Sequence, residues 1–419
     1  MTTPHNVDQA ARGSIWFVLV VVMLDVLGIG LIIPVLPSLV RQFTEDPQAQ
    51  SLWYGLLATA YSTMQFLAAP ALGALSDRYG RRPVLLVCVF GLGIDFLLLA
   101  LAPDLKTLLL ARCIGGVTGA SFAVCSAYLS DVSSGEERLK AFGFMGAVFG
   151  VGFVVGPALG GFLGAIHLRL PFYLASGLAL LNGLYGYFVL PEPPRAAPRP
   201  QINWRAMNPF ATLIDLFKIK NVAPLVWVFV LTTLGQFTLQ STLLLYNQIR
   251  FDWGPLPNGI AMVIVGLCAI IMQGFLLAKL AHLWGETRTI VVGLCSAIVT
   301  FLAYGIVSSM WALYFVIFAN LLYFGVSPTL QAIISTWFGK EKQGAALGTL
   351  QAISSLMGVL GPLLGTQLLA QASRMGAHDW QLGLPFYAAG ALQIAALVIM
   401  VRFQEKFRAT MAPVMGGRC

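Results

Sequence analysis

Apolar residues in this chain fall into blocks that are each long enough to cross a lipid bilayer as a helix. The hydrocarbon core of a bilayer is about 30 Å thick and takes roughly 20 helical residues to span. Blocks of that length lie at 14–38, 53–75, 83–102, 106–130, 139–166, 171–190, 222–248, 258–280, 289–308, 311–335, 343–371 and 383–402. The sequence therefore predicts an all-α membrane protein with twelve transmembrane helices, the first of which is not a cleaved signal.

Composition argues against the soluble alternatives. The 419 residues are 58% hydrophobic and 10% charged, against roughly 25% charge in soluble domains. A soluble all-α enzyme would have to expose large apolar patches. His5, His167, His282 and His378 fall in predicted loops or near the termini, and the six cysteines show no metal or disulfide spacing. We therefore expect no enzyme, no metal site and no cofactor.

Positive charge is distributed unevenly between the two sides that twelve spans create. Of the 25 Lys and Arg residues, all but six fall on the side that holds both termini and the central loop. Arg112 lies inside an apolar block, and the opposite side holds Arg41, Lys106, Arg169, Arg250 and Arg374. Cytoplasmic loops carry the excess of Lys and Arg, so both termini are predicted to be cytoplasmic. The net charge of +8 is thus a topology signal, and we expect no nucleic-acid partner.

The two halves of the chain repeat each other. Gly-Pro-x-x-Gly occurs at 156–160 and again at 361–365, an offset of 205 residues. The same offset separates Gly80 from Gly285. Repeats of this kind are typical of transporters, whose substrate site lies between the halves near the bilayer midplane.

A polar stretch at 191–221 joins the halves. It is rich in Pro and Arg and too polar to span a membrane. We therefore predict a six-helix bundle over 1–190, a cytoplasmic linker over 191–221 and a second six-helix bundle over 222–419.

The loop between the second and third predicted spans carries the densest motif, Gly-Ala-Leu-Ser-Asp-Arg-Tyr-Gly-Arg-Arg-Pro at 73–83. Its second glycine allows a tight turn, and its aspartate stands where an Arg or a helix N-terminus can partner it. The motif resembles the cytoplasmic signature loop of the major facilitator superfamily; the alternative is a basic loop that serves topology alone. The resemblance implies a clasp that holds one conformation of a rocking transporter. The residues of this predicted conformational gate are Gly73, Asp77, Arg78, Gly80, Arg81 and Arg82.

Two further motifs resemble the same superfamily. Arg-Cys-Ile-Gly-Gly-Val-Thr-Gly at 112–119 is similar to its span-four arginine motif. Span five carries small residues similar to the motif characteristic of its antiporters, namely Gly152, Gly156, Pro157, Gly160 and Gly161. Small residues let helices approach closely, and the proline suits a bend at the contact between the halves. Helix packing is therefore the direct role of this motif, and antiport is what the resemblance implies.

The first predicted span narrows the resemblance. Leu-Asp-Val-Leu-Gly-Ile-Gly-Leu-Ile-Ile-Pro-Val-Leu-Pro at 24–37 resembles the first helix of the tetracycline efflux proteins, and Gly91, Asp95 and Gln273 match that family as well. In that family the first-helix aspartate, here Asp25, takes part in handling substrate and protons. The resemblance implies a proton-coupled drug antiporter in the cytoplasmic (inner) membrane of a bacterium.

Three charged side chains lie well inside the apolar blocks: Asp25, Asp95 and Arg112. A charge in hydrocarbon costs at least about 2.5–3.5 kcal/mol, so each is a candidate for proton coupling. If Arg112 stabilises one carboxylate as an anion, burial disfavours the charged form of the other. The open alternatives are that Arg112 only snorkels outward, that Asp95 is a structural partner of Arg112 alone, and that Asp25 is purely structural.

The second half has no charged residue well inside its predicted spans, but its neutral polar and aromatic residues suit an amphipathic substrate. Predicted substrate contacts are Asp25, Gln65, Gln236 and Gln273, although such a glutamine can equally be a helix-packing residue. The tetracycline efflux pattern is incomplete, because its span-eight histidine is Ala269 here and its span-nine aspartate is Ala297. Tetracycline travels as a divalent metal chelate in that family, so export of another amphipathic compound is an open alternative.

The sequence thus predicts an antiporter that exports a small amphipathic drug, tetracycline-like or another antibiotic, in exchange for protons by alternating access. One alternative is a proton-linked transporter of an endogenous metabolite; the antiporter-like motif argues against import. Another is a membrane sensor, for which no segment is long enough to form a soluble output domain. The expected partners are the substrate, protons and the lipid bilayer, and we expect a monomer.

Overall fold

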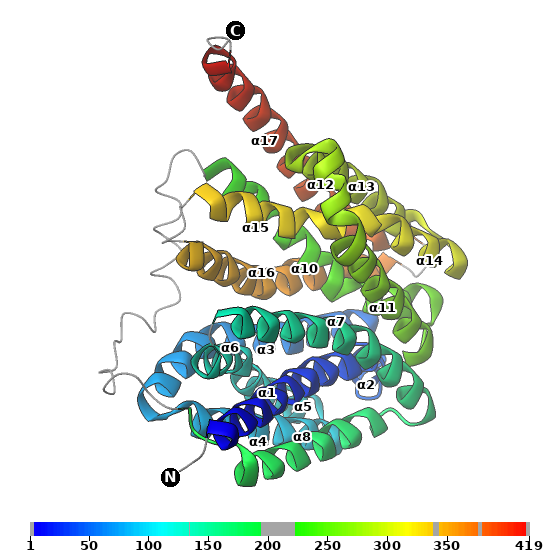
Figure 1. Cartoon of the computed structure of the whole chain (residues 1–419). Helices are drawn as coiled ribbons and strands as arrows, with labels where there is room; N and C mark the ends of the chain where they lie inside the picture. Colours follow the sequence, from blue (N-terminus) through cyan, green and yellow to red (C-terminus); the bar gives the residue numbers. More distant parts are fainter. Residues whose placement is uncertain (1–3, 134, 194–222, 338–342, 376–378, 416–419) are drawn as a thin grey trace. The chain divides into compact units, whose positions relative to one another are not determined.

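The computed structural model describes residues 4–133, 135–193, 223–337, 343–375 and 379–415. Throughout these residues the chain forms helices and short connections, with no β-strand (Figure 1). The prediction of an all-α protein is confirmed.

The helices follow the chain in two series. The first half contains α1 (Pro4–Ile32), α2 (Leu36–Arg41), α3 (Pro47–Tyr79), α4 (Arg81–Leu101), α5 (Leu105–Thr118), α6 (Ser121–Val132), α7 (Gly135–Ile166) and α8 (Leu170–Val189). The second half contains α10 (Ala223–Phe251), α11 (Pro255–Ile270), η1 (Ile271–Leu276), α12 (Leu277–Trp284), α13 (Glu286–Ile306), α14 (Met310–Ala319), η2 (Asn320–Gly325), α15 (Val326–Trp337), α16 (Gln343–Ala372), η3 (Ser373–Met375), η4 (Trp380–Gly383) and α17 (Leu384–Met415).

Each of the twelve predicted spans coincides with a helix or with helices joined end to end. In the described part of the chain, eleven helical segments are long and apolar enough to cross a membrane. The remaining predicted span, 53–75, lies inside α3, which has 33 residues. α3 has sufficient length but is less apolar, because it carries Ser62, Thr63 and Gln65 among its apolar residues.

Contacts between the helices divide the chain into two units. The first comprises Met1–Pro209 together with Asp252–Val263, and the second comprises Phe210–Phe251 together with Ile264–Cys419. The first turns of α11 therefore pack with the first unit, and the rest of that helix belongs to the second. Most of the predicted linker lies outside the described residues, as does the border between Pro209 and Phe210.

The predicted repeat is visible in the backbone. Gly80 joins α3 to α4 with φ 120° and ψ 152°, and Gly285 joins α12 to α13 with φ 81° and ψ 153°. No other glycine in the described residues has a positive φ. Residues with a side chain rarely adopt this conformation, so both halves make the same turn at positions 205 residues apart.

The repeated Gly-Pro-x-x-Gly motif also packs in the same way in each half. On α7, a Cβ at Gly156 would lie only 2.9 Å from the Cα of Gly30 on α1. On α16, a Cβ at Gly361 would lie 2.5 Å from the Cβ of Phe237 on α10. Each motif thus lets the fifth span of its half pack against the first span of the same half.

Four of the predicted continuous spans are interrupted, the first of them at 33–35, between α1 and α2. The fourth breaks at Gly119 and Ala120, between α5 and α6, and the tenth passes through the 3₁₀-helical η2 between α14 and α15. The eighth contains the π-helical η1. Hydropathy alone does not reveal these irregular turns, because each lies inside a segment that is apolar on average.

Candidate functional site

A buried ion pair joins α4 to α5. Arg112 donates from Nη2 to the Oδ2 of Asp95 at 2.8 Å and to its Oδ1 at 3.1 Å. Asp95 is fully buried, and Arg112 is 5% exposed. Space for the carboxylate comes from Gly115, where a Cβ would collide with Asp95. The arginine motif of span four therefore both supplies the cation and leaves room for its partner.

Tyr61 on α3 covers another side of the Arg112 guanidinium, whose carbon lies 5.3 Å from the ring centroid. This is a cation–π distance. Gly116 lets α5 approach α3 closely at this point: a Cβ there would lie only 2.7 Å from the Cβ of Met64. Tyr61 was not predicted as a site residue. The spaced glycines of the arginine motif indicated close packing there, but they did not identify the side chain.

Asp25 on α1 has a neutral hydrogen-bond partner. Ser121, the first residue of α6, donates from Oγ to its Oδ2. Two buried thiols, Cys88 and Cys125, lie within electrostatic reach of the carboxyl. The structure therefore brings Asp95 and Arg112 together, and it holds Asp25 beside the break in span four.

The two carboxyl groups differ in how their negative charge is compensated. An ionised carboxylate away from water is costly unless it is paired or hydrogen-bonded. Arg112 gives Asp95 a charged donor, whereas Ser121 gives Asp25 a neutral one, which is weaker. Asp25 is therefore the carboxyl group of the two whose charge a proton removes more readily.

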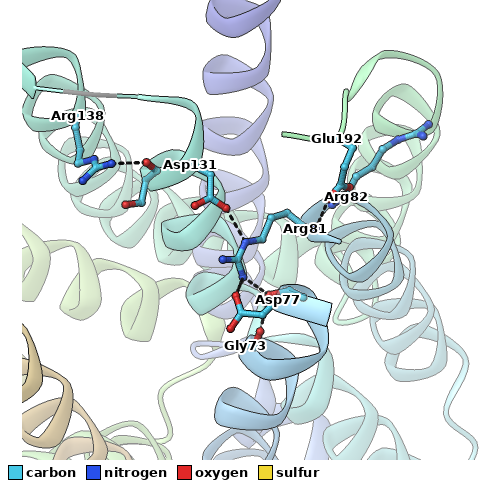
Figure 2. Close-up of polar contacts among 9 residues, drawn as sticks. Gly73, Asp77, Arg81, Arg82, Asp131, Arg138 and Glu192 are labelled. Atoms are coloured by element: carbon cyan, nitrogen blue, oxygen red, sulfur yellow. Dashed lines mark hydrogen bonds and ion pairs between the residues drawn. The ribbon is translucent and has the colours of Figure 1, made fainter. Parts of the chain in front are cut away.

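Arg81 lies at the centre of the polar contacts in the signature loop, as Figure 2 shows. Its guanidinium pairs with Asp77 on α3 at 2.5 Å and with Asp131 on α6 at 2.9 Å. It also donates to the hydroxyl of Ser76 at 2.6 Å. The side chain of Arg81 is only 16% exposed. A single guanidinium on α4 thus joins the ends of three helices.

Glu192, which follows α8, holds the start of α4. Its two carboxylate oxygens accept from the backbone N–H groups of Arg81 at 2.8 Å and Arg82 at 2.9 Å. The first N–H groups of a helix have no partner within it, and negative charge is favourable at that end. The side chain of Arg82 donates in turn to the carbonyl of Tyr187 on α8 at 2.5 Å. α4 and α8 are therefore tied together at this end.

Two other predicted gate residues, Gly73 and Arg78, lie near this network. The carbonyl of Gly73 accepts from the Ser76 hydroxyl at 2.8 Å, and a Cβ at Gly73 would face open space. Arg78 is exposed, with its guanidinium 5.6 Å from the ring of Tyr79.

Two acidic members of the network, Asp131 and Glu192, were not predicted. They lie 50 and 111 residues from Arg81 in the chain. Asp131 had a recognisable signal, since it is a single carboxylate at the end of an apolar block. Arg138 marks the same helix end by donating to the carbonyl of Ser130 at 2.6 Å (Figure 2).

The antiporter-like motif on α7 packs closely against neighbouring helices of the first unit. Besides the approach to α1 at Gly156, a Cβ at Gly160 would lie 2.8 Å from the Cα of Leu31. Gly161 faces the first turns of α11, where its Cβ would lie 2.9 Å from the Cα of Gly259. These turns of α11 belong to the first unit.

The predicted substrate-contacting glutamines have different surroundings. Gln65 on α3 donates to the carbonyl of Gly119 at 3.1 Å, so it satisfies an acceptor at the break in span four. Gln236 is partly buried on α10, and Gln273 is exposed in the π-helical η1. π-helical turns are rare and occur frequently at functional sites. The three glutamines are thus divided between the two units.

The second unit has a neutral counterpart of the ion pair. Thr300 on α13 donates to the side-chain carbonyl of Asn320 at 2.9 Å, and both residues are buried. Thr300 lies 205 residues after Asp95, and Asn320 lies 205 residues after Gly115. The repeat therefore preserves a polar contact between the third and fourth spans of each half, while only the first half has charge there.

Comparison with known proteins identifies the family of this chain. A family model described as Major Facilitator Superfamily matches residues 18–335. The class C tetracycline resistance protein of Escherichia coli is 37% identical, over 94% of this chain and 97% of its own. The class H tetracycline resistance protein of Pasteurella multocida is 35% identical, over 94% of this chain and 96% of its own.

A solved structure shows the same fold. The crystal structure of the human organic anion transporter MFSD10 matches with a TM-score of 0.68 and 23% identity, over 95% of this chain and 100% of that chain. The family predicted from the signature loop is confirmed. This multi-pass membrane protein belongs to the Major Facilitator Superfamily of small-molecule transporters.

Proposed function

We propose that this protein is an antiporter that exports a small amphipathic drug across the cytoplasmic membrane of a bacterium in exchange for protons. Its nearly full-length similarity to tetracycline resistance proteins supports export of a drug, with tetracycline as the first candidate. The excess of Lys and Arg on one side supports cytoplasmic termini. The proposed transporting unit is the monomer.

The contrast between the two buried carboxyl groups carries the proton-coupling part of this proposal. Asp95 is paired with Arg112, whereas Asp25 is hydrogen-bonded to the neutral Ser121. In the proposed cycle, Asp25 binds a proton from one side of the membrane and releases it to the other. The ion pair remains as a fixed structure beside it.

The Arg81 network is the proposed conformational gate. Its contacts join the ends of α3, α4 and α6 within the first unit, and we propose that they form in one state of the transporter and open in the other. The pairs of Arg81 with Asp77 and Asp131 are partly exposed, so water can replace them at small cost. Such contacts bias a conformational equilibrium without locking it.

The substrate part of the proposal rests on the absence of charge in the predicted ninth span. The buried Thr300–Asn320 pair and Ala297 make the region of span nine neutral, where the tetracycline efflux pattern has an aspartate. A neutral site suits an amphipathic compound that travels without a metal ion. We therefore propose drug export as the function and leave a metal–tetracycline chelate and a metal-free drug as alternative substrates.

Proton movement in proteoliposomes tests the proposal. The protein is reconstituted with a pH indicator inside, and three substrates are added in turn: tetracycline with Mg²⁺, tetracycline with a chelator, and a hydrophobic organic cation. The expected result is drug-dependent proton movement in the wild type and its loss in Asp25→Asn. Glu45→Gln, an exposed acidic position between α2 and α3, is the matched control and should behave as wild type.

The outcomes separate the parts of the proposal. Coupling that persists unchanged in Asp25→Asn would refute the role of Asp25. Coupling to the organic cation alone would exclude tetracycline as a substrate while retaining the antiport mechanism. Drug movement without any proton movement in the wild type would refute antiport with protons altogether.

A further inference from the structure

We propose that Tyr61 is a positioning residue of proton exchange, whose hydroxyl donates to the Asp25 carboxylate once that group has lost its proton. This inference rests on the proposed proton coupling at Asp25. It identifies the Tyr61 hydroxyl as the group that stabilises the negative charge on Asp25 after the proton has left.

The hydroxyl of Tyr61 is buried and has no hydrogen-bond partner among the described residues. Buried polar groups in native proteins are nearly always hydrogen-bonded, and an exception requires an explanation. The ring is held over Arg112, so the phenol is anchored at one end while its donor is unused at the other. The free hydroxyl can therefore donate to a carboxylate that forms when a neighbouring carboxyl group loses its proton.

The unused donor lies beside the break in span four. A Cβ on Gly119 would lie 2.6 Å from the Tyr61 hydroxyl oxygen. Ser121, two residues further along, donates to Asp25. Gln65, one turn after Tyr61 on α3, occupies the carbonyl of Gly119. Tyr61 and Asp25 therefore both lie against the segment 119–121, where the carbonyl of Gly119 already accepts from Gln65.

The charged surroundings indicate which acceptor the phenol serves. The charged groups around the phenol come from three helices: Arg112 from α5 lies over its ring, Asp95 from α4 pairs with Arg112, and Asp25 from α1 accepts from Ser121. Cys88 from α4 and Cys125 from α6 lie in turn within reach of Asp25. Asp95 already has its cation, so the carboxyl group that gains most from an additional donor is Asp25.

A phenol that donates to the ionised carboxylate makes loss of the proton easier. Hydrogen bonds to a charged form favour that form. Without the hydroxyl, Asp25 keeps its proton to higher pH, and the pH dependence of drug-coupled proton release moves upward. Packing alone would not have this effect, because phenylalanine retains the ring over Arg112.

The test compares Tyr61→Phe, Tyr61→Leu and wild type by drug-coupled proton release in proteoliposomes, using the drug that the wild type transports. Tyr61→Phe should move the pH midpoint upward by about one unit, as expected for loss of one hydrogen bond to a charge, with an unchanged KM for the drug. Tyr61→Leu should show the same shift and, because the ring is lost, a lower thermal midpoint. Tyr54→Phe, a buried tyrosine on the same helix, is the control and should leave the midpoint unchanged.

The inference is refuted if the pH midpoint of Tyr61→Phe coincides with that of the wild type, or if Tyr54→Phe shifts it equally. A wild type without drug-coupled proton movement would instead refute the proposed antiport itself. The pH dependence of drug binding to the purified protein gives a second readout for a variant that reconstitutes poorly. It should show the same upward shift.

Discussion

Arg112 and Asp95 face each other on neighbouring helices, joined by two hydrogen bonds from one guanidinium nitrogen and almost completely shielded from solvent. Removing one member of such a pair leaves an uncompensated buried charge and costs about 3–5 kcal/mol, whereas replacing both with neutral groups costs far less. We therefore expect Asp95→Asn and Arg112→Gln each to destabilise the protein more than the double variant does. Thermal unfolding in detergent measures this difference. Losses that simply add in the double variant would contradict the pairing.

The Arg81 network predicts a kinetic effect. Asp77→Asn and Asp131→Asn each remove one partly exposed ion pair worth about 0.2–1 kcal/mol, so each should change the transport rate by up to roughly fivefold. The KM for the drug should stay constant, because neither residue lies near Asp25 in the chain or among its contacts. Single-turnover transport assays measure the rate. Glu45→Gln, at an exposed acidic position outside the network, serves as control, and an equal effect there would argue against a specific role for the Arg81 pairs.

The glycines of α7 predict opposite effects of the same substitution. A Cβ at Gly160 would lie 2.8 Å from the backbone of α1, whereas one at Gly150 would meet nothing within 4 Å. Gly160→Ala should therefore destabilise the protein by about 1–3 kcal/mol through overpacking. Gly150→Ala should be neutral or stabilise it by up to about 1 kcal/mol, because alanine loses less entropy in a helix. Equal unfolding midpoints for the two variants would rule out the close approach at Gly160.

Asp104 predicts a pH dependence at the start of α5. Its carboxylate accepts from the backbone N–H of Thr107 at 2.7 Å, which lowers the pKa of Asp104 below its ordinary value. A carboxyl group with a depressed pKa in the folded state stabilises the fold above its ordinary pKa, and this contribution is lost as the pH falls. Asp104→Ala should therefore lower the unfolding midpoint at neutral pH and have little effect in acid. A difference that grows on acidification would contradict the capping role.

Hydrophobic block length was sufficient to predict the helices, because the bilayer sets the same length requirement on every span. The weaker case is α3, which carries polar residues such as Gln65; this side chain donates to the carbonyl of Gly119 inside the unit. The turns at Gly80 and Gly285 could also be predicted from the sequence, because their positive φ favours glycine at the same position in both copies of the repeat.

The sequence alone did not predict which residues of the site pair with each other. The sequence presented two buried carboxyl groups and one guanidinium, and it left open which of Asp25 and Asp95 pairs with Arg112. The answer depends on the rotation of α4 about its axis and on the space beside Gly115, neither of which hydropathy encodes. Ser121 was missed because the break that directs it toward α1 lies within an uninterrupted apolar block.

A membrane potential does work only on net charge that moves through it, about 2.3 kcal/mol per elementary charge for each 100 mV. Arg112 and Asp95 carry opposite charges, and Thr300 and Asn320 carry none, so neither pair senses voltage as a unit. The charge of Asp25 depends on its proton. We therefore expect the electrical part of the proton-motive force to act through Asp25 only in the half-cycle in which it is ionised, and the chemical part to act when it is protonated.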